Sequence, residues 1–130
     1  MKINEKTVNT KTELLNLIKE GVNPLEYVKE ERDIDFISNS IIIDGNDEDP
    51  YYEETAEIVF KAILYYVLFT HNEEKTLERC KEIAKMKIEE IKELVAKEER
   101  ANVLFKPVEI ASEKTAKEVF EKLNDRLSKI

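Results

Sequence analysis

Five basic residues near the C-terminal end of the chain have a spacing that suits binding to phosphate. Lys122, Arg126 and Lys129 follow one another at i, i+4 and i+7, which places them along one side of a helix. Lys114 and Lys117 add a basic pair near the start of the same segment. Cations on one helix face could contact the backbone of DNA, so these five residues are the predicted DNA contacts. The alternative is that their aliphatic stems only cover the edge of the core, because acidic residues are interleaved with them and weaken the field.

A second group of charged residues is acidic and lies before the middle of the chain. Its members are Asp44, Asp47, Glu48, Asp49, Glu53 and Glu54. Such a surface could dock a basic protein, whereas helix capping and solvation are the simpler explanation. A calcium loop of the EF-hand type is excluded, because Gly45 stands at the second position instead of the sixth and Thr55 replaces the glutamate at the twelfth.

Catalytic and cofactor chemistry finds few suitable residues in this sequence. The chain has 1 histidine (His71), 1 cysteine (Cys80) and 2 glycines. A structural zinc site or a bridged carboxylate metal site needs more histidine or cysteine ligands than this. Gly21 and Gly45 are too far apart to form a phosphate-binding loop. We therefore expect no enzyme activity, no metal and no cofactor, and we expect Cys80 and the pair Tyr65 and Tyr66 to pack in the core.

The charge of the chain is concentrated in one segment. The formal net charge of the 130 residues is −8. Residues 31–60 contain ten acids and one base, a net charge of −9, whereas residues 81–130 contain twelve bases and eleven acids. This asymmetry opposes nucleic-acid binding by the domain as a whole and leaves it possible on a local basic face.

The elements that position these groups are predicted to be helices. Residues 1–11 are polar and are expected to form a loose lead-in, followed by a short helix from a Thr12 cap to Gly21. Asn23-Pro24 starts another short helix that runs to about Glu30. We expect Asp33 to cap the next segment, in which Ile41–Ile43 suit either a helix or a strand.

The second half of the chain contains the longest apolar patterns. Asp49-Pro50 begins a helix that runs to about Thr70 and is apolar all round from Ala62 to Phe69, which is typical of the central helix of a bundle. One apolar seam extends over 73–100, in either one long helix or two helices with a bend near Met86. Short helical pieces or an ordered connection are expected over 102–111, and Ser112 is expected to cap the last helix.

Together these patterns predict an all-α fold, a bundle of six or seven helices around the helix at about 50–70. The predicted organisation is a lead-in with a short helix over 1–21 and one helical domain over 22–130. The first residues lack the apolar region of a signal peptide, and the longest apolar run is far shorter than the roughly 20 residues that cross a bilayer. A cytoplasmic location is expected.

Three stretches of the sequence resemble a known family. They are Asn23-Pro24-Leu25-Glu26-Tyr27-Val28 with the run to Ile43, the acidic loop that ends in Asp49-Pro50-Tyr51-Tyr52-Glu53 before an apolar helix, and Ile110-Ala111-Ser112-Glu113-Lys114-Thr115 with the later Arg126-Leu127-Ser128. In this order they resemble the all-alpha domain of conjugative coupling proteins, the TraG/TraD-like ATPases of type IV secretion systems, in their Gram-positive variety. The resemblance covers about 22–128.

The resemblance implies a domain that recognises the cargo of conjugation. The family's domain is a helical insert on the cytoplasmic face of a membrane-anchored hexamer, and it receives the relaxase, accessory proteins and transferred DNA. The family's ATP-binding motifs do not occur in this chain, so it is either an excised domain, expected to be monomeric, or a stand-alone relative. A stand-alone adaptor that binds protein and no nucleic acid is the alternative function.

Overall fold

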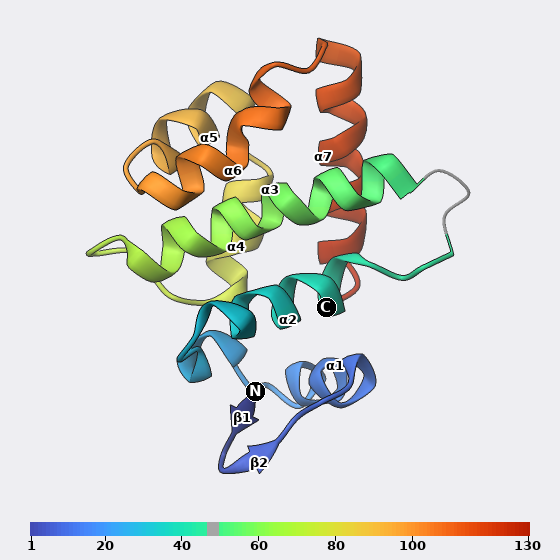
Figure 1. The fold of residues 1–130 in the computed structure, drawn as a ribbon, viewed down its shortest axis with the longest axis vertical. Helices are drawn as coiled ribbons and strands as arrows, with labels where there is room; N and C mark the ends of the chain where they lie inside the picture. The colour runs from blue at the N-terminus through green and yellow to red at the C-terminus, as the bar shows by residue number, and fades with distance from the viewer. Residues whose placement is uncertain (47–49) are drawn as a thin grey trace.

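Helix α3 (Pro50–Phe69) crosses the middle of the molecule, and the other helices of the bundle pack around it (Figure 1). The computed structural model describes residues 1–46 and 50–130 of the chain. Every residue from Ala62 to Val67 is buried, so this stretch of α3 has no face toward water. In the described part of the chain, α3 packs against α2 (Glu31–Ile42), α4 (Leu77–Ala84), α5 (Ile88–Val95), α6 (Glu99–Glu109) and α7 (Glu113–Leu127). The predicted all-α fold around a central apolar helix is confirmed.

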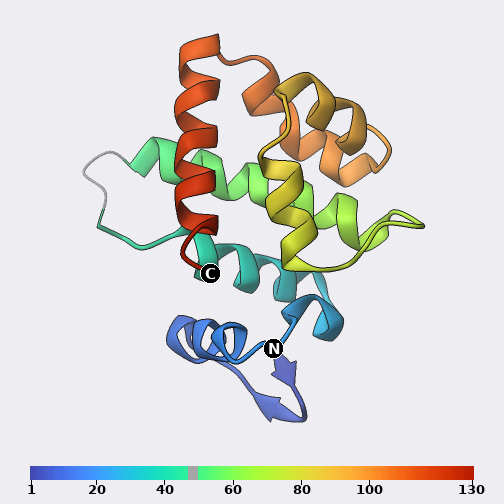
Figure 2. The same ribbon diagram turned by 180° about the vertical axis from the view of Figure 1, so that it is seen from behind.

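The surrounding helices cover α3 from several directions. α6 and α2 lie on opposite sides of it in Figure 1. Seen from behind in Figure 2, α7 (red) and α4 (yellow) lie in front of α3, and they also contact each other. Tyr65, Tyr66 and Cys80 are all buried in this packing, as the sequence predicts.

The first residues form a hairpin, so the prediction of a loose lead-in over 1–11 is wrong. Strands β1 (Lys2–Ile3) and β2 (Lys6–Thr7) pair antiparallel through a turn in which Asn4 and Glu5 have positive φ angles of 52° and 67°. The hairpin buries Ile3 and Val8, each 2% exposed. Two apolar residues among polar neighbours were too weak a pattern to reveal a strand pair, and burial against the bundle stabilises it.

Helix α1 (Lys11–Lys19) begins at Thr10, two residues before the predicted cap Thr12. The Thr10 hydroxyl accepts a hydrogen bond from the Glu13 amide at 3.2 Å, while Thr12 is exposed inside the helix. The helix ends where expected, because Gly21 has a φ of 95°, a conformation that costs a side-chain-bearing residue about 1 kcal/mol or more.

The next two helices begin close to their predicted positions, but the length of the first and the cap of the second differ from the prediction. Asn23 caps a single 3₁₀ helix, η1 (Pro24–Tyr27), which is shorter than the predicted helix to Glu30. α2 starts at Glu31, and Asp33 sits inside its first turn instead of capping it. The Asp33 carboxylate turns back and accepts the amides of Lys29 and Glu30 at 2.9 and 3.1 Å. α2 continues through Ile42, which decides between the helix and strand alternatives.

In the C-terminal half, the 73–100 seam is divided between α4 and α5, with the bend at residues 85–87 close to Met86. The segment predicted as short pieces around Pro107 is one continuous helix, α6. Proline removes only the hydrogen bond to the carbonyl of Val103, a residue 63% exposed to water, so the helix tolerates it. Ser112 caps α7 as predicted, accepting from the Thr115 amide at 3.2 Å.

Candidate nucleic-acid interface

Helix α7 presents two of the predicted DNA contacts directly to water. Its buried stripe includes Val119, Leu123 and Leu127, which face the bundle. Lys114 lies on the opposite side, Lys117 lies on the flank shared with Asn124, and both are exposed. Neither lysine forms an ion pair with any residue that the structure describes.

The other two predicted lysine contacts, Lys122 and Lys129, differ from these in exposure and in their neighbours. Lys129, just beyond the helix, is 62% exposed and lies 3.5 Å from the Asp125 carboxylate. Lys122 is half-buried. Glu121 is exposed four residues after Lys117 and seven after Lys114, so an acid shares the face of those two lysines. The face is therefore basic only in patches, and its N-terminal half carries the two lysines with no ion-pair partner among the described residues.

Arg126 lies inside the protein and not on the lysine face, so its prediction as an exposed DNA contact is wrong. Only 7% of its side chain is exposed. Its Nη2 lies 2.8 Å from a carboxylate oxygen of Glu53 and 3.1 Å from one of Asp44, and its Nε donates to the carbonyl of Ile42 at 3.0 Å. Helical spacing placed Arg126 beside Lys122 and Lys129, but it could not show that the boundary of the buried stripe passes through it.

The predicted acidic docking residues differ in exposure, because Arg126 holds two of them. Glu53 is buried, with 4% of its side chain exposed, so it cannot serve as an exposed docking residue. Asp44 is partly exposed and is held by Arg126, and the hydrogen bond from the Asn46 amide holds its pKa below the usual value. Glu54 is exposed. The predicted docking residues Asp47, Glu48 and Asp49 lie outside the described residues.

The fold adds two lysines that sequence reasoning missed. The Asn124 amide of α7 donates to the carbonyl of Ala84, the last residue of α4, at 3.0 Å. This contact places the turn after α4 beside α7, and Lys85 and Lys87 are exposed on that turn. Lys117 lies two helical turns before Asn124, on the same side of α7. The signal in the sequence was a lysine pair at the bend near Met86, but only the packing shows that it adjoins α7.

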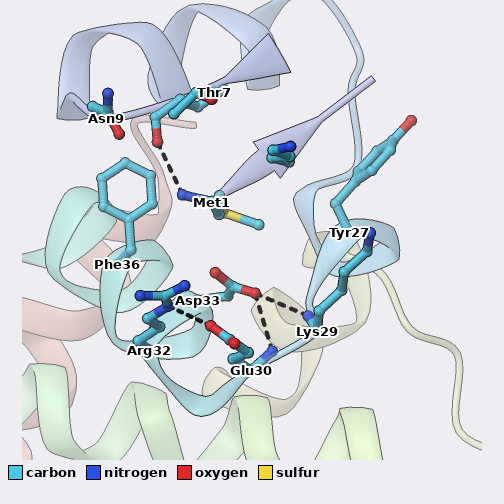
Figure 3. Close-up of a pocket in the computed structure, with 11 residues that line it drawn as sticks. Met1, Thr7, Asn9, Tyr27, Lys29, Glu30, Arg32, Asp33 and Phe36 are labelled. Atoms are coloured by element: carbon cyan, nitrogen blue, oxygen red, sulfur yellow. Dashed lines mark hydrogen bonds and ion pairs between the residues drawn. The ribbon is translucent and has the colours of Figure 1, made fainter. Parts of the chain in front are cut away.

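The cavity drawn in Figure 3 has the volume of a small-molecule site but not the chemistry of one. It encloses about 510 Å³ between the N-terminal hairpin, η1 and the start of α2. Its carboxylates are already engaged, because Asp33 accepts the two backbone amides described above and Glu30 pairs with Arg32. Over residues 1–46 and 50–130, no group of three or more histidine, cysteine, aspartate or glutamate side chains is placed to hold a metal ion.

Comparison with known proteins agrees with this architecture of an all-α binding domain. The family model described as "Type IV secretion-system coupling protein DNA-binding domain" matches residues 22–130, most of the chain. The chain therefore belongs to that family, and the family resemblance of the sequence is confirmed. A search of curated proteins returned no match, and neither did a search of solved structures. In the described part of the chain no helix is long and apolar enough to cross a bilayer.

Proposed function

We propose that this chain is the substrate-recognition domain of a conjugation coupling protein and binds DNA through α7. Membership of the coupling-protein DNA-binding family is the observation that carries the proposal. The exposed lysines Lys114, Lys117 and Lys129 supply the phosphate contacts, with Lys122 at their edge. Lys85 and Lys87 extend this basic surface across the turn after α4.

The electrostatics of this surface predict binding that is modest and sensitive to salt. Each phosphate neutralised by a lysine lowers the slope of log K against log salt by about 0.9 for duplex DNA. Acidic neighbours such as Glu121 reduce the local potential, so we expect only a few phosphate contacts and little discrimination between sequences. Selection of a particular DNA would then depend on the other components of the transfer complex.

The test is a salt-titrated mobility-shift assay on three forms of the full chain. Lys114→Glu/Lys117→Glu should weaken binding to duplex DNA by tenfold or more and make the salt slope shallower by about 2. Lys6→Glu/Lys19→Glu carries the same change in net charge on exposed residues outside the family match, and should change both much less. Equal losses in the two variants would contradict a DNA site on α7.

The protein partner in this proposal is a relaxase or a relaxosome accessory protein with a basic surface. Glu54 is exposed and close in sequence to Asp47, Glu48 and Asp49, which together make the acidic segment the docking candidate. Loss of relaxase pull-down after Asp47→Asn/Glu48→Gln/Asp49→Asn would support this role, and unchanged pull-down would contradict it.

In the parent protein the domain would face the cytoplasm from a membrane-anchored hexamer, and ATP hydrolysis would belong to the motor.

A protein-only adaptor is the second candidate, favoured by the net charge of −8 and by the acids on α7. It predicts no DNA binding even at low salt, together with retained pull-down of a partner. The mobility-shift assay therefore separates the two functions directly.

A further inference from the structure

A second surface, away from the α7 lysines, combines a groove with exposed apolar side chains. The groove has a volume of about 410 Å³ and lies where α2, α3 and α6 meet. Tyr65 of α3 and Val103 and Leu104 of α6 form its apolar part. The groove thus extends over α3 between its two flanking helices, which lie on opposite sides of it in Figure 1.

Two exposed apolar side chains lie in or beside this groove. Phe69 is 50% exposed and Val103 is 63% exposed, and only two other large apolar residues of the described chain are exposed, Tyr51 and Ile110. The Phe69 ring stacks on the Tyr65 ring with centroids 5.8 Å apart, so Phe69 lies beside the groove that Tyr65 lines. Exposed apolar side chains gathered at a groove are a feature of interaction sites on soluble proteins.

Arg100 connects the residues around this surface. Its guanidinium carbon lies 4.1 Å from the centroid of the Phe69 ring and 4.9 Å from that of Tyr65. The same guanidinium reaches Glu98 at 3.1 Å and Glu31 of α2 at 3.3 Å. These contacts place the Arg100 guanidinium over the two rings and between α2 and α6.

The rim of the groove has an excess of negative charge. Lys61 lies 3.2 Å from Asp35 and Arg100 lies 3.3 Å from Glu31, so these two cations and two carboxylates balance one another. A further carboxylate, Glu99, also lines the groove. Burial and the charges of Glu31 and Asp35 raise the pKa of the Tyr65 hydroxyl, which is consistent with a negative potential here.

We propose that this groove docks an apolar segment, flanked by lysine or arginine, from a partner protein. Large apolar side chains of the segment would cover Val103 and the exposed part of Phe69, and its cations would meet Glu99, with the paired Glu31 and Asp35 beside it. A nucleic acid is disfavoured, because the same carboxylates repel phosphate. The inference goes beyond the proposed DNA binding and the acidic docking segment, since it concerns a different surface, where α2, α3 and α6 meet.

The experiment measures binding of three synthetic 14-residue peptides to the full chain by fluorescence anisotropy. The first is an amphipathic leucine–lysine helix, the second replaces every lysine with glutamate, and the third replaces every leucine with serine. We expect the leucine–lysine peptide to bind at least tenfold more tightly than either control peptide. Equal binding of the leucine–glutamate peptide would contradict the acidic rim as a determinant, and no binding of the leucine–lysine peptide would overturn the proposal.

Matched variants locate the binding site. Val103→Ser and Phe69→Ser should each weaken binding of the leucine–lysine peptide about tenfold, because each removes exposed apolar area from the groove. Ile110→Ser is the control, since Ile110 is 85% exposed just beyond the opposite end of α6 from Arg100, and it should change nothing. Equal effects of all three variants would overturn the assignment.

Two further outcomes are decisive. Self-association of the wild-type chain that Val103→Ser abolishes would mean that a second copy occupies the groove, and would replace the proposed partner. The α7 variant Lys114→Glu/Lys117→Glu should bind the leucine–lysine peptide like wild type, and Val103→Ser should bind DNA like wild type. The failure of either proposal is therefore distinguishable from the failure of the other.

Discussion

Arg126 and Glu53 form a buried ion pair across the bundle, with Nη2 of the arginine 2.8 Å from Oε2 of the glutamate. The two residues are 73 positions apart in the sequence and join the last helix to the start of the central one. The same carboxylate accepts the Asp44 amide at 3.2 Å, and the arginine also reaches the Asp44 carboxylate. This cluster holds the chain that leaves α2 against α7.

Removing the arginine should destabilise the fold strongly. Arg126→Met leaves the Glu53 carboxylate buried without its cation, and breaking a buried pair in this way costs about 3–5 kcal/mol. Urea denaturation followed by circular dichroism measures the loss. Lys129→Met is the control and should change the free energy of unfolding by less than about 0.5 kcal/mol, because Lys129 is 62% exposed. Equal stabilities of the two variants would contradict a structural role for Arg126.

Two phenylalanines of α3 should differ sharply in their contribution to stability. Phe60 is fully buried and Phe69 is 50% exposed. Phe60→Ala should cost about 3–5 kcal/mol through lost burial and a residual cavity. Phe69→Ala should cost about 1 kcal/mol or less, because the ring loses only its stacking on Tyr65 and Arg100. Similar costs in thermal or urea unfolding would be incompatible with the observed position of α3.

Glu73 makes part of the stability depend on pH. The Arg79 guanidinium, whose Nε lies 2.6 Å from Glu73, lowers the pKa of that carboxyl below 4.5, and the Tyr66 hydroxyl also donates to it. A carboxyl whose pKa is lower in the folded state stabilises it above the unfolded pKa, and this contribution disappears as pH falls through the folded pKa. The free energy of unfolding of wild type should therefore decrease below about pH 4.5.

The matched variants for this prediction are neighbours in the sequence. Glu73→Gln should flatten part of the acid limb of the curve of stability against pH, because the glutamine does not titrate. Glu74→Gln removes an exposed carboxylate at the next position and should leave the limb unchanged. A limb that is identical in wild type and Glu73→Gln would show that Glu73 carries none of it.

The single thiol should react only when the protein unfolds. Cys80 is fully buried in α4, and desolvation raises the pKa of its thiol to about 12. Because the thiolate is the reactive form, an aromatic disulfide reagent should label native protein far more slowly than protein in urea. Labelling of the native chain at the rate of a free cysteine would contradict the packing of α4 on α3 and α7.

The sequence by itself determined the fold class, the central helix and the starts of η1, α3 and α7. Those depend on local chemistry, namely the apolar run at Ala62–Phe69, prolines after capping residues and the Ser112 cap. The stretches that resemble the coupling-protein family were also visible without a structure. The predicted caps of α1 and α2 were wrong by two or three residues, because a nearby residue caps each helix instead.

Only the tertiary structure decided which charged residues are available to a partner. Arg126 and Lys129 follow the same spacing rule, yet one is buried against Glu53 and the other is exposed. The groove beside Val103 likewise requires three helices from separate parts of the chain. Helical periodicity specifies the angle of a side chain around its own axis, whereas its exposure depends on neighbours that come from distant sequence.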